Sequence, residues 1–265
     1  MTQLMGIVNV TPDSFYMPSR KVDISQALER ISEEIAQGAD WIDIGAESTR
    51  PYSKPLSPEE ELNRLEPLLS ELKNSCRVPF SIDTRKALVA KRAVAAGASM
   101  INDIEGFRDE DMRQVALESE ALLCVMHMPT TPETMQLHTH YPEGIVPHLI
   151  NWFSARIALL TSIGIDKKRI ILDPGIGFGK TVEDNVRIIK NLPKLKALGF
   201  PLLLGISRKS FMQKILKTTA EMVLPATLAI NSLAIFFSDV DFIRVHDIAE
   251  HRQLIDLMAY LRTVQ

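Results

Sequence analysis

The chain has 265 residues, of which 46% are hydrophobic and 24% are charged, and this composition is typical of a globular protein with a substantial core. Its net charge of −3 provides no basic field that would attract nucleic acid or an anionic membrane, so neither is expected as a partner. Any binding of anions must therefore be local.

Apolar runs of strand length alternate with helical patterns along the chain. Ser57-Pro58-Glu59-Glu60 predicts a capping box with proline at the first helical position, and Asp23-x-x-Gln26 and Asp247-x-x-Glu250 predict two more. The predicted strands cover residues 4–10, 41–44, 78–82, 99–101, 122–126, 169–172, 201–204 and 241–245. The predicted helices cover residues 23–37, 58–72, 87–96, a short segment from 109, 147–163, a segment from 181, 207–237 with a break near 217–225, and a last segment from 247.

The alternation gives eight strand–helix units of about 33 residues each, a length usual for a closed (β/α)8 barrel. No Pro/Ser-rich linker or shift in composition marks a second domain. We therefore predict an α/β fold in which residues 1–265 form a single TIM barrel, with the active site at the C-terminal ends of the strands. An open doubly wound sheet is the alternative, although it normally has fewer strands.

A carboxylate and a glycine-rich loop follow the sixth predicted strand, in the order Asp173-Pro174-Gly175-x-Gly177-x-Gly179-Lys180-Thr181. The glycine spacing differs from the dinucleotide-binding fingerprint by one place, and a P-loop needs glycine where Pro174 stands. Glycine has no Cβ, so such a loop can bring bare backbone close to a ligand. Three interpretations stay open: a ligand loop around Asp173, a structural turn, and a P-loop nucleotide-binding module.

Many polar side chains follow the predicted strands and should form a ring at one rim of the barrel. Each alone could be a helix cap or a solvated charge, but their number at one rim indicates a binding site. The ring consists of Asn9, Asp13, Glu47, Ser48, Thr49, Arg50, Asp83, Arg85, Asn102, Asp103, His127, Asp173, Lys180, Ser207, Arg208, Lys209, Arg244 and His246.

The ring contains two kinds of chemistry. Asp83, Asn102 and Asp173 can recognise the donor–acceptor edge of a heterocycle, as Asn and Asp do with nucleic-acid bases. The hydroxyl and basic side chains suit phosphate oxygens; they are Ser48, Thr49, Arg50, Arg208, Lys209, Arg244 and His246. The residues therefore predict a barrel that binds a phosphorylated, amino-substituted heterocycle, and they leave the reaction open.

Other classes of site find little support. His138, His140 and His148 are expected to be solvated loop histidines rather than metal ligands, and no Gly-x-Ser-x-Gly elbow indicates a serine hydrolase. Cys76 and Cys124 are far apart, and a reducing cytoplasmic location fits them. The first apolar run lacks the basic leader of a signal peptide, so it is not expected to be one. The apolar stretch 226–237 is too short to span a bilayer.

Eight motifs together resemble the dihydropteroate synthase family of pterin-binding (β/α)8 enzymes. They span nearly the whole chain in the family's order, which makes the resemblance specific. The motifs are Met5-Gly6-Ile7-Val8-Asn9-Val10-Thr11-Pro12-Asp13-Ser14-Phe15, Asp43-Ile44-Gly45-Ala46-Glu47-Ser48-Thr49-Arg50-Pro51, Ser81-Ile82-Asp83-Thr84, Ile101-Asn102-Asp103-Ile104, Met126-His127-Met128, the loop 173–180, Ser207-Arg208-Lys209 and Arg244-Val245-His246.

The resemblance implies that 6-hydroxymethyl-7,8-dihydropterin diphosphate condenses with p-aminobenzoate to give 7,8-dihydropteroate and diphosphate. It implies catalytic roles for Asp173, Lys209, Arg244 and His246. The pterin would be bound by Asp83, Asn102, Met126, Asp173, Phe178 and Lys209. The diphosphate would be bound by Asn9, Ser48, Thr49, Arg244 and His246, with Mg2+ as cofactor on Asn9. The p-aminobenzoate pocket, where sulfonamides compete in the family, would be formed by Arg50, Pro51, Phe178, Lys209 and Ser210.

The implied chemistry agrees with the character of these groups. Mg2+, Arg and His would stabilise negative charge on the departing diphosphate. The Asp173 carboxylate would stabilise the cationic pterin, so the neutral arylamine could attack without a strong general base. We therefore expect a dissociative, SN1-like transfer.

The chain departs from the family after Ser14-Phe15, where Tyr16-Met17-Pro18-Ser19-Arg20 replaces the usual Ser-Asp-Gly-Gly. The altered loop bears on p-aminobenzoate recognition. The alternatives to a synthase are a pterin-binding homologue without that activity or a methyl-folate-dependent methyltransferase, and more remotely the P-loop module. A nearly all-apolar helical stretch around residues 228–237 and the family's dimers indicate a homodimer.

Overall fold

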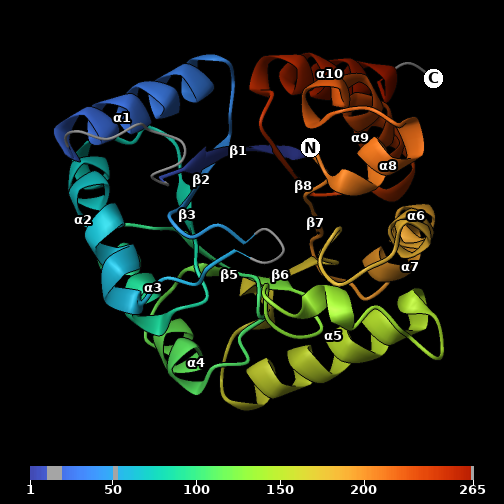
Figure 1. The fold of residues 1–265 in the computed structure, drawn as a ribbon, viewed down its shortest axis with the longest axis horizontal. Helices are drawn as coiled ribbons and strands as arrows, with labels where there is room; N and C mark the ends of the chain where they lie inside the picture. Colours follow the sequence, from blue (N-terminus) through green and yellow to red (C-terminus); the bar gives the residue numbers. More distant parts are fainter. Residues whose placement is uncertain (11–19, 50–52, 264–265) are drawn as a thin grey trace.

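The computed structural model describes residues 1–10, 20–49 and 53–263. Its centre is an eight-stranded parallel sheet that curls into a barrel, with helices around the outside (Figure 1). The strands are β1 (Gln3–Asn9), β2 (Trp41–Gly45), β3 (Phe80–Asp83), β4 (Met100–Asp103), β5 (Leu122–Met126), β6 (Ile170–Asp173), β7 (Leu203–Leu204) and β8 (Phe242–Val245).

The strand order in the sheet is β6-β5-β4-β3-β2-β1-β8-β7, and every pairing is parallel. An isolated parallel bridge between Leu172 and Leu202 joins the two ends of this order, so the barrel is nearly closed. The fold is therefore the predicted (β/α)8 barrel rather than an open doubly wound sheet.

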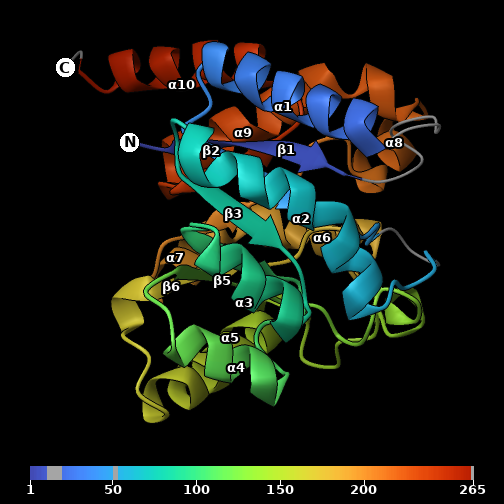
Figure 2. The ribbon, with the colours of Figure 1, turned by 90° about the vertical axis from the view of Figure 1, so that its left-hand side faces the viewer.

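The helices lie between successive strands in sequence and cover the barrel. Figure 2 shows the first four stacked along one side, where neighbouring helices contact each other. The α-helices are α1 (Arg20–Ala36), α2 (Pro58–Ser75), α3 (Ala87–Ala95), α4 (Glu110–Leu117), α5 (Ile145–Ser162), α6 (Val182–Lys190), α7 (Leu192–Lys196), α8 (Ser210–Leu216), α9 (Leu224–Ser238) and α10 (Ile248–Leu261). Short 3-10 helices occur at Met135–Leu137, Lys167–Arg169 and Ala220–Met222.

Two apolar cores hold the barrel together. The larger lies between the sheet and the helices and includes Ile42, Ile82 and Ile101, which are fully buried. The smaller fills the inside of the barrel, where strand residues meet across the axis. It consists of Met5, Trp41, Met100, Cys124, Ile171, Leu203 and Phe242.

The alternation of a strand places polar side chains directly above this inner plug. Side chains two residues apart point to the same face of a strand, so the next inward positions lie toward the C-terminal ends. After Trp41 comes Asp43, and after Phe242 comes Arg244. With Asn102, Asp173 and Asp83 on their own strands, these residues form what we call the polar layer. The apolar plug therefore closes the polar layer on the side toward the N-terminal ends of the strands.

Most expected elements are confirmed, with differences at their ends. Strand β7 has only two residues instead of four, and the helical segment predicted from 181 is divided into α6 and α7. The predicted break in the long helical region is confirmed, because α8 and α9 are separated there. The break follows Lys217, whose φ of 50° ends α8 in a left-handed conformation.

The capping signals had mixed outcomes. The Ser57–Glu60 box forms in both directions, and Asp109 and Thr181 cap α4 and α6 as expected. The box at Asp23 is wrong, because α1 begins at Arg20. The box at Asp247 is also wrong: its carboxylate pairs with Arg208 across the rim instead of capping α10.

Cys124 is buried in the inner plug, and both cysteines are free thiols. Within the described ranges, none of the helices has the length and apolar character needed to cross a membrane.

Candidate active site

The polar layer is organised around a buried carboxylate, Asp43 on β2. Its side chain is fully buried and accepts hydrogen bonds from three neighbours on three other strands. One oxygen accepts from the hydroxyl of Ser81. The other accepts from Nδ2 of Asn102 at 3.1 Å and from Nε of Arg244 at 2.5 Å. Asp43 thus ties β2 to β3, β4 and β8 inside the barrel.

Arg244 is shared between two carboxylates. Its Nη2 donates to Oδ2 of Asp83 at 2.8 Å, while its Nε donates to Asp43. These carboxylates raise the pKa of Arg244 against the effect of burial, so the guanidinium stays charged. Burial raises the pKa of Asp83 to about 7, although Arg244 opposes the shift. In this structure Arg244 therefore faces the barrel interior, where it balances the charge of the polar layer.

Asn102 presents a free acceptor. Its Nδ2 is used by Asp43, but its Oδ1 is buried and has no hydrogen-bond partner among the described residues. A buried acceptor without a partner is costly, and native proteins seldom keep one without a functional reason. Asn102 is only 4% exposed, so bulk water does not readily satisfy this oxygen. The arrangement is suited to a ligand that donates an N–H group.

Asp173 ends β6 at the start of the glycine-rich loop. Its Oδ1 accepts from the backbone N–H of Gly175 at 2.7 Å, and burial raises the pKa of its carboxyl group. Gly175 has a φ of 66°, and a Cβ there would lie 2.1 Å from the carbonyl oxygen of His127. The glycine is therefore required for the loop to pack closely behind Asp173.

Lys209 and Phe178 form the boundary between the polar layer and an apolar cluster. The ammonium of Lys209 lies 4.3 Å from the ring centroid of Phe178, a cation–π contact. Burial and the nearby charge of Arg244 lower the pKa of Lys209 to about 8. The apolar cluster beside it consists of Ile104, Met126, Met128, Met135 and Phe178. A flat ring could thus contact apolar side chains while its edge meets the carboxylates.

The remaining basic residues of the ring are less available to an anion than the sequence suggested. Burial lowers the pKa of His246 to about 4, so its imidazole is neutral, and Nδ1 lies 3.0 Å from Oγ of Ser207. Arg208 is exposed and donates to Asp247 at 2.6 Å. Among the described residues, Arg208 is therefore paired and His246 is uncharged, so these two do not form an open cationic patch.

Several predicted ring members bind each other and support the loops. Arg85 pairs with Glu47 at 3.1 Å and with Glu105 at 3.0 Å. Asp103 accepts from the backbone N–H groups of Glu105 and Phe107 and so shapes the turn after β4. These residues brace the rim and do not face the polar layer.

The structure gives Lys180 and His127 a different place from the rim. Lys180 is 5% exposed, and its Nζ contacts the carbonyl oxygens of Phe178 at 2.9 Å and His127 at 3.2 Å. It also lies 3.1 Å from Nδ1 of His127. An ammonium held in this way cannot cradle a phosphate, which removes the P-loop interpretation. The lysine instead fastens the glycine-rich loop to the end of β5.

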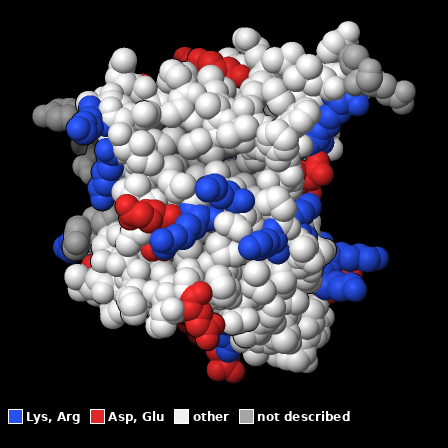
Figure 3. Space-filling model, turned by 90° about the vertical axis from the view of Figure 1, so that its right-hand side faces the viewer, with Lys and Arg blue, Asp and Glu red and all other residues white. Residues whose placement is uncertain are grey.

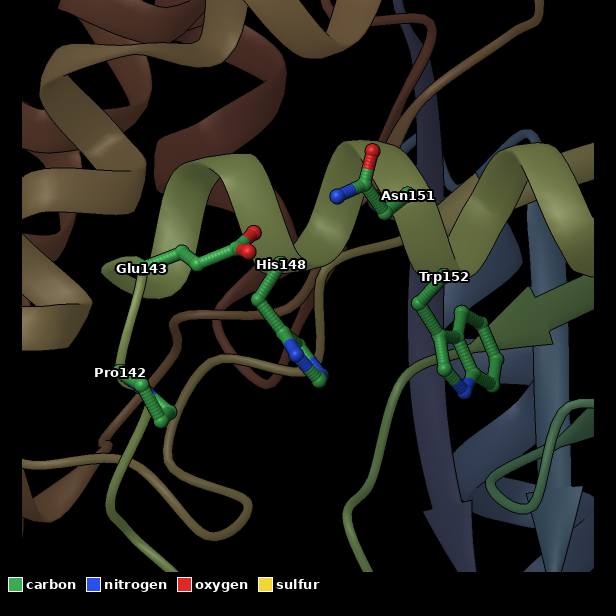
Figure 4. Close-up of a pocket in the computed structure, with 5 residues that line it drawn as sticks. All are labelled: Pro142, Glu143, His148, Asn151 and Trp152. Carbon is green, nitrogen blue, oxygen red and sulfur yellow. The ribbon is translucent and has the colours of Figure 1, made fainter.

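A chain of polar contacts continues from His127 to the surface. Nε2 of His127 lies 3.0 Å from Nε2 of His148, so the prediction of a merely solvated His148 is wrong. His148 opens into a surface cavity of about 410 Å3, and Figure 4 shows its ring pointing away from the helix backbone among the lining residues. They are Pro142, Glu143, His148, Asn151 and Trp152. His138 and His140, by contrast, are exposed as predicted.

A second cavity, of about 480 Å3, lies between the glycine-rich loop and α8. Gly177 and Ser210 both line it, so it reaches Ser210, one of the predicted p-aminobenzoate residues. Arg50 and Pro51, together with Asp13 and residues 16–19 of the altered first loop, lie outside the described residues.

Three of the predicted diphosphate residues lie near the C-terminal ends of β1 and β2. The side chains of Asn9, at the end of β1, and of Ser48, after β2, are exposed, while Thr49 is partly buried. In the described part of the chain, no three His, Cys, Asp or Glu side chains come together as a metal site. Asn9 offers a carboxamide oxygen, a hard ligand of the kind that Mg2+ prefers. One such ligand can be sufficient where water and substrate phosphate supply most of the other Mg2+ ligands.

Sequence reasoning missed Asp43 as a member of the site. A signal was present, because a charged residue stands in the middle of the apolar strand Trp41–Ile42–Asp43–Ile44 of a sheet buried on both faces. Such a charge is unfavourable unless it is paired. The pattern therefore predicts a cationic partner for Asp43 inside the barrel.

The amino-acid sequence matches a known family over most of its length. The sequence profile of a family described as pterin binding enzyme matches residues 5–246. Dihydropteroate synthase from Clostridium beijerinckii is 41% identical over 251 residues, which cover 94% of this chain and 90% of that protein.

Solved structures agree with the sequence match. The crystal structure of dihydropteroate synthase from Clostridium difficile in the presence of pteroic acid has a TM-score of 0.92 at 38% identity, covering 98% of this chain and 96% of that one. The Yersinia pestis dihydropteroate synthase in a sulfonamide drug complex has a TM-score of 0.92 at 34% identity, covering 99% and 95%.

The buried Lys180 predicts a pH-dependent stability. Burial lowers its pKa from 10.5 to about 7, so between these values the unfolded chain binds more protons than the folded one. The contribution of Lys180 to the free energy of unfolding should therefore rise with pH across this window. Denaturant unfolding of wild type and Lys180→Met should show a difference in unfolding free energy that grows from about pH 7 toward pH 10.

Lys190→Met on the exposed face of α6 is the matched control for the loss of a lysine side chain. Parallel curves of unfolding free energy against pH for wild type and Lys180→Met would contradict the assignment of a buried lysine with a lowered pKa.

Proposed function

Because the chain belongs to the family of pterin-binding enzymes that includes dihydropteroate synthase, we propose a role in that reaction for each part of the polar layer and its rim. The activity is that of a dihydropteroate synthase, a transferase of folate biosynthesis. It condenses 6-hydroxymethyl-7,8-dihydropterin diphosphate with p-aminobenzoate and releases diphosphate. We propose that residues 1–265 act as one pterin-binding domain.

The pterin edge is assigned to Asp83, Asn102 and Asp173. A pterin carries an amino group and ring N–H groups along one edge, and these are donors. The observation that carries the assignment is the buried Oδ1 of Asn102, which lacks a partner among the described residues. Two carboxylates on neighbouring parts of the same layer supply further acceptors. The three residues together match the hydrogen-bonding pattern of that edge.

The pterin ring is assigned to the apolar cluster and to Lys209. Met126 and Phe178 are buried in that cluster and offer an apolar surface to one side of the ring. Lys209 lies against Phe178 and can donate to the heterocycle. Its pKa of about 8 keeps most of its ammonium charged near neutral pH.

The diphosphate is assigned to Asn9, Ser48, Thr49, Arg244 and His246. Hydroxyl and imidazole groups at the rim can donate to its oxygens, and neutral His246 has one N–H for this purpose. Arg244 supplies fixed positive charge from the polar layer. Mg2+ carried by the substrate would be held by Asn9 and would neutralise charge on the leaving group. The exposed carboxamide of Asn9 fits this use.

The reaction is assigned a dissociative, SN1-like course. As the carbon–oxygen bond breaks, its electron pair leaves with the diphosphate, and positive charge develops on the pterin. The buried carboxylate of Asp173 would stabilise that charge, in a layer that the apolar plug closes from below. The amino nitrogen of p-aminobenzoate then forms the new bond and loses one proton.

The p-aminobenzoate site is assigned to the cavity beside the glycine-rich loop, with Phe178, Lys209 and Ser210. Ser210 lines that cavity, and Lys209 borders the pterin site, so the two substrates would meet there. Arg50 and Pro51 complete the proposed pocket. Sulfonamides, which are arylamine analogues, are proposed to compete at this position.

A homodimer is proposed from an exposed apolar face on the late helices. Figure 3 shows a broad area without charged side chains above a band of lysine and arginine. On α9, Leu233, Phe236 and Phe237 are 53%, 45% and 69% exposed. On the adjoining α10, Leu257 is 54% exposed. Apolar side chains gathered in this way are typical of a protein interface.

A cytoplasmic location is also proposed. It is supported by the free thiols of Cys76 and Cys124, which suit a reducing compartment.

Asp173→Asn should lower kcat by about a hundredfold or more, because it removes a preorganised charge from the developing cation. The measurement supplies dihydropterin diphosphate, p-aminobenzoate and Mg2+ and follows dihydropteroate and diphosphate, which should appear in equal amounts with wild type.

Asp241→Asn is the control, because Asp241 lies before β8 at the opposite end of the barrel and pairs with Lys196. It should retain wild-type turnover. Pterin binding by wild type without either product would instead support a homologue without synthase activity. Wild-type turnover by Asp173→Asn would remove Asp173 from the mechanism.

Phe237→Glu should convert the dimer into a monomer, because it places a charge in the proposed apolar interface. Light scattering should show the mass of a single chain, 29.7 kDa, for the variant and twice that mass for wild type. Leu88→Glu, at an apolar site on α3 that is 45% exposed, should remain dimeric. A monomeric wild type or a dimeric Phe237→Glu would refute this interface.

A further inference from the structure

Asp43 has no place in the roles assigned so far, although it is the most connected side chain of the polar layer. It is fully buried beneath the residues assigned to the pterin. It accepts from Ser81, Asn102 and Arg244, and two of these belong to the substrate site. Its position suggests action through those neighbours rather than direct contact with substrate.

The first neighbour is the amide of Asn102, which could in principle face either way. A carboxylate can only accept, so the NH2 group of Asn102 must turn toward Asp43. The 3.1 Å contact between Nδ2 and the carboxylate has this geometry. Oδ1 is then directed away from Asp43 and is left as the buried acceptor without a partner among the described residues. The carboxylate thus decides which atom of Asn102 a ligand meets.

The second neighbour is Arg244. Its Nε is held by Asp43, and its Nη2 reaches Asp83. Without Asp43 the guanidinium would have one fewer buried anion to balance it, and its long side chain would gain freedom. The position of Arg244 beside Asp83 therefore depends on the same carboxylate.

The side chain at position 43 has to serve three donors at once. The two oxygens of Asp43 accept one hydroxyl, one amide and one guanidinium hydrogen bond. An asparagine there would have one acceptor oxygen and two N–H donors of its own. At least one of the three donors would lose its partner, and Asn102 would be free to turn over.

We propose that Asp43 is a positioning residue for substrate specificity: it fixes the amide of Asn102 with its oxygen toward the pterin and holds Arg244 beside Asp83. The polar layer then presents acceptors, and it selects a heterocycle whose edge carries N–H donors. A heterocycle without the 2-amino group leaves such an acceptor unpaired and binds more weakly. This inference rests on the pterin site of the proposed function.

The test measures a ratio of affinities rather than activity. The probes are 6-hydroxymethylpterin and its analogue without the 2-amino group, each titrated against the folded protein by calorimetry. Wild type should bind the amino compound at least about tenfold more tightly, as expected for a buried acceptor that loses its donor. Asp43→Asn should reduce that preference to about threefold or less, because Asn102 can then present either atom.

A reciprocal swap keeps the test decisive if the single variant is unstable. Combining Asp43→Asn with Asn102→Asp preserves the net charge and reverses the donor–acceptor pair. The new asparagine donates, and the new carboxylate keeps an oxygen toward the ligand. The preference for the amino compound should return to within about threefold of wild type, since an acceptor again faces the donor edge.

Asp241→Asn is the control for charge removal and should keep the wild-type ratio. A general loss of stability would lower the active fraction for both probes and leave the ratio unchanged. An unchanged ratio in folded Asp43→Asn, or no recovery in the folded swap, would overturn the proposal. Because the probes lack diphosphate, a failure of the synthase assay would not alter this result.

Discussion

A buried charge pair between Asp43 and Arg244 is the constraint on which the site depends. Both side chains project into the barrel above an apolar plug, where an unpaired charge would be strongly unfavourable. The pair is tolerated because Ser81, Asn102 and Asp83 complete its hydrogen bonds. The same bonds that satisfy the pair also fix the orientation of the residues that face the ligand. The interactions that stabilise the barrel interior therefore also order the side chains of the site.

The rim divides into supports and open groups. Glu47 and Arg85 brace the loops by pairing with each other, and Lys180 fastens the glycine-rich loop to β5 through His127. These contacts use up polar groups that might otherwise compete for the ligand. What remains open is a small set of acceptors in the polar layer, bordered by Lys209 and the apolar cluster. A site of this kind achieves selectivity by leaving only the required groups unpaired.

The sequence was sufficient for the barrel, because eight apolar strands alternate with capped helices and the inward positions follow from the alternation of a strand. It also led to Asp83, Asn102 and Asp173, since they lie at the C-terminal ends of their strands. It could not reveal which carboxylates pair with Arg244 or that Lys180 is buried, because these contacts depend on residues of other strands. Asp43 was missed although a charge inside an apolar strand was a signal for it. The false caps at Asp23 and Asp247 show that a short motif competes with tertiary contacts, here the Arg208–Asp247 pair.

In the proposed role of Asp43, the interior of the barrel sets the hydrogen-bonding polarity of the site. Neutron diffraction from deuterated crystals with 6-hydroxymethylpterin bound tests this role, since it locates the hydrogen positions that X-ray structures at ordinary resolution leave to inference. Both deuterium atoms of the Asn102 amide should lie on the side of Asp43, and the pterin should donate a deuterium to Oδ1. An Asn102 amide whose nitrogen faces the pterin, with its oxygen toward Asp43, would refute this role.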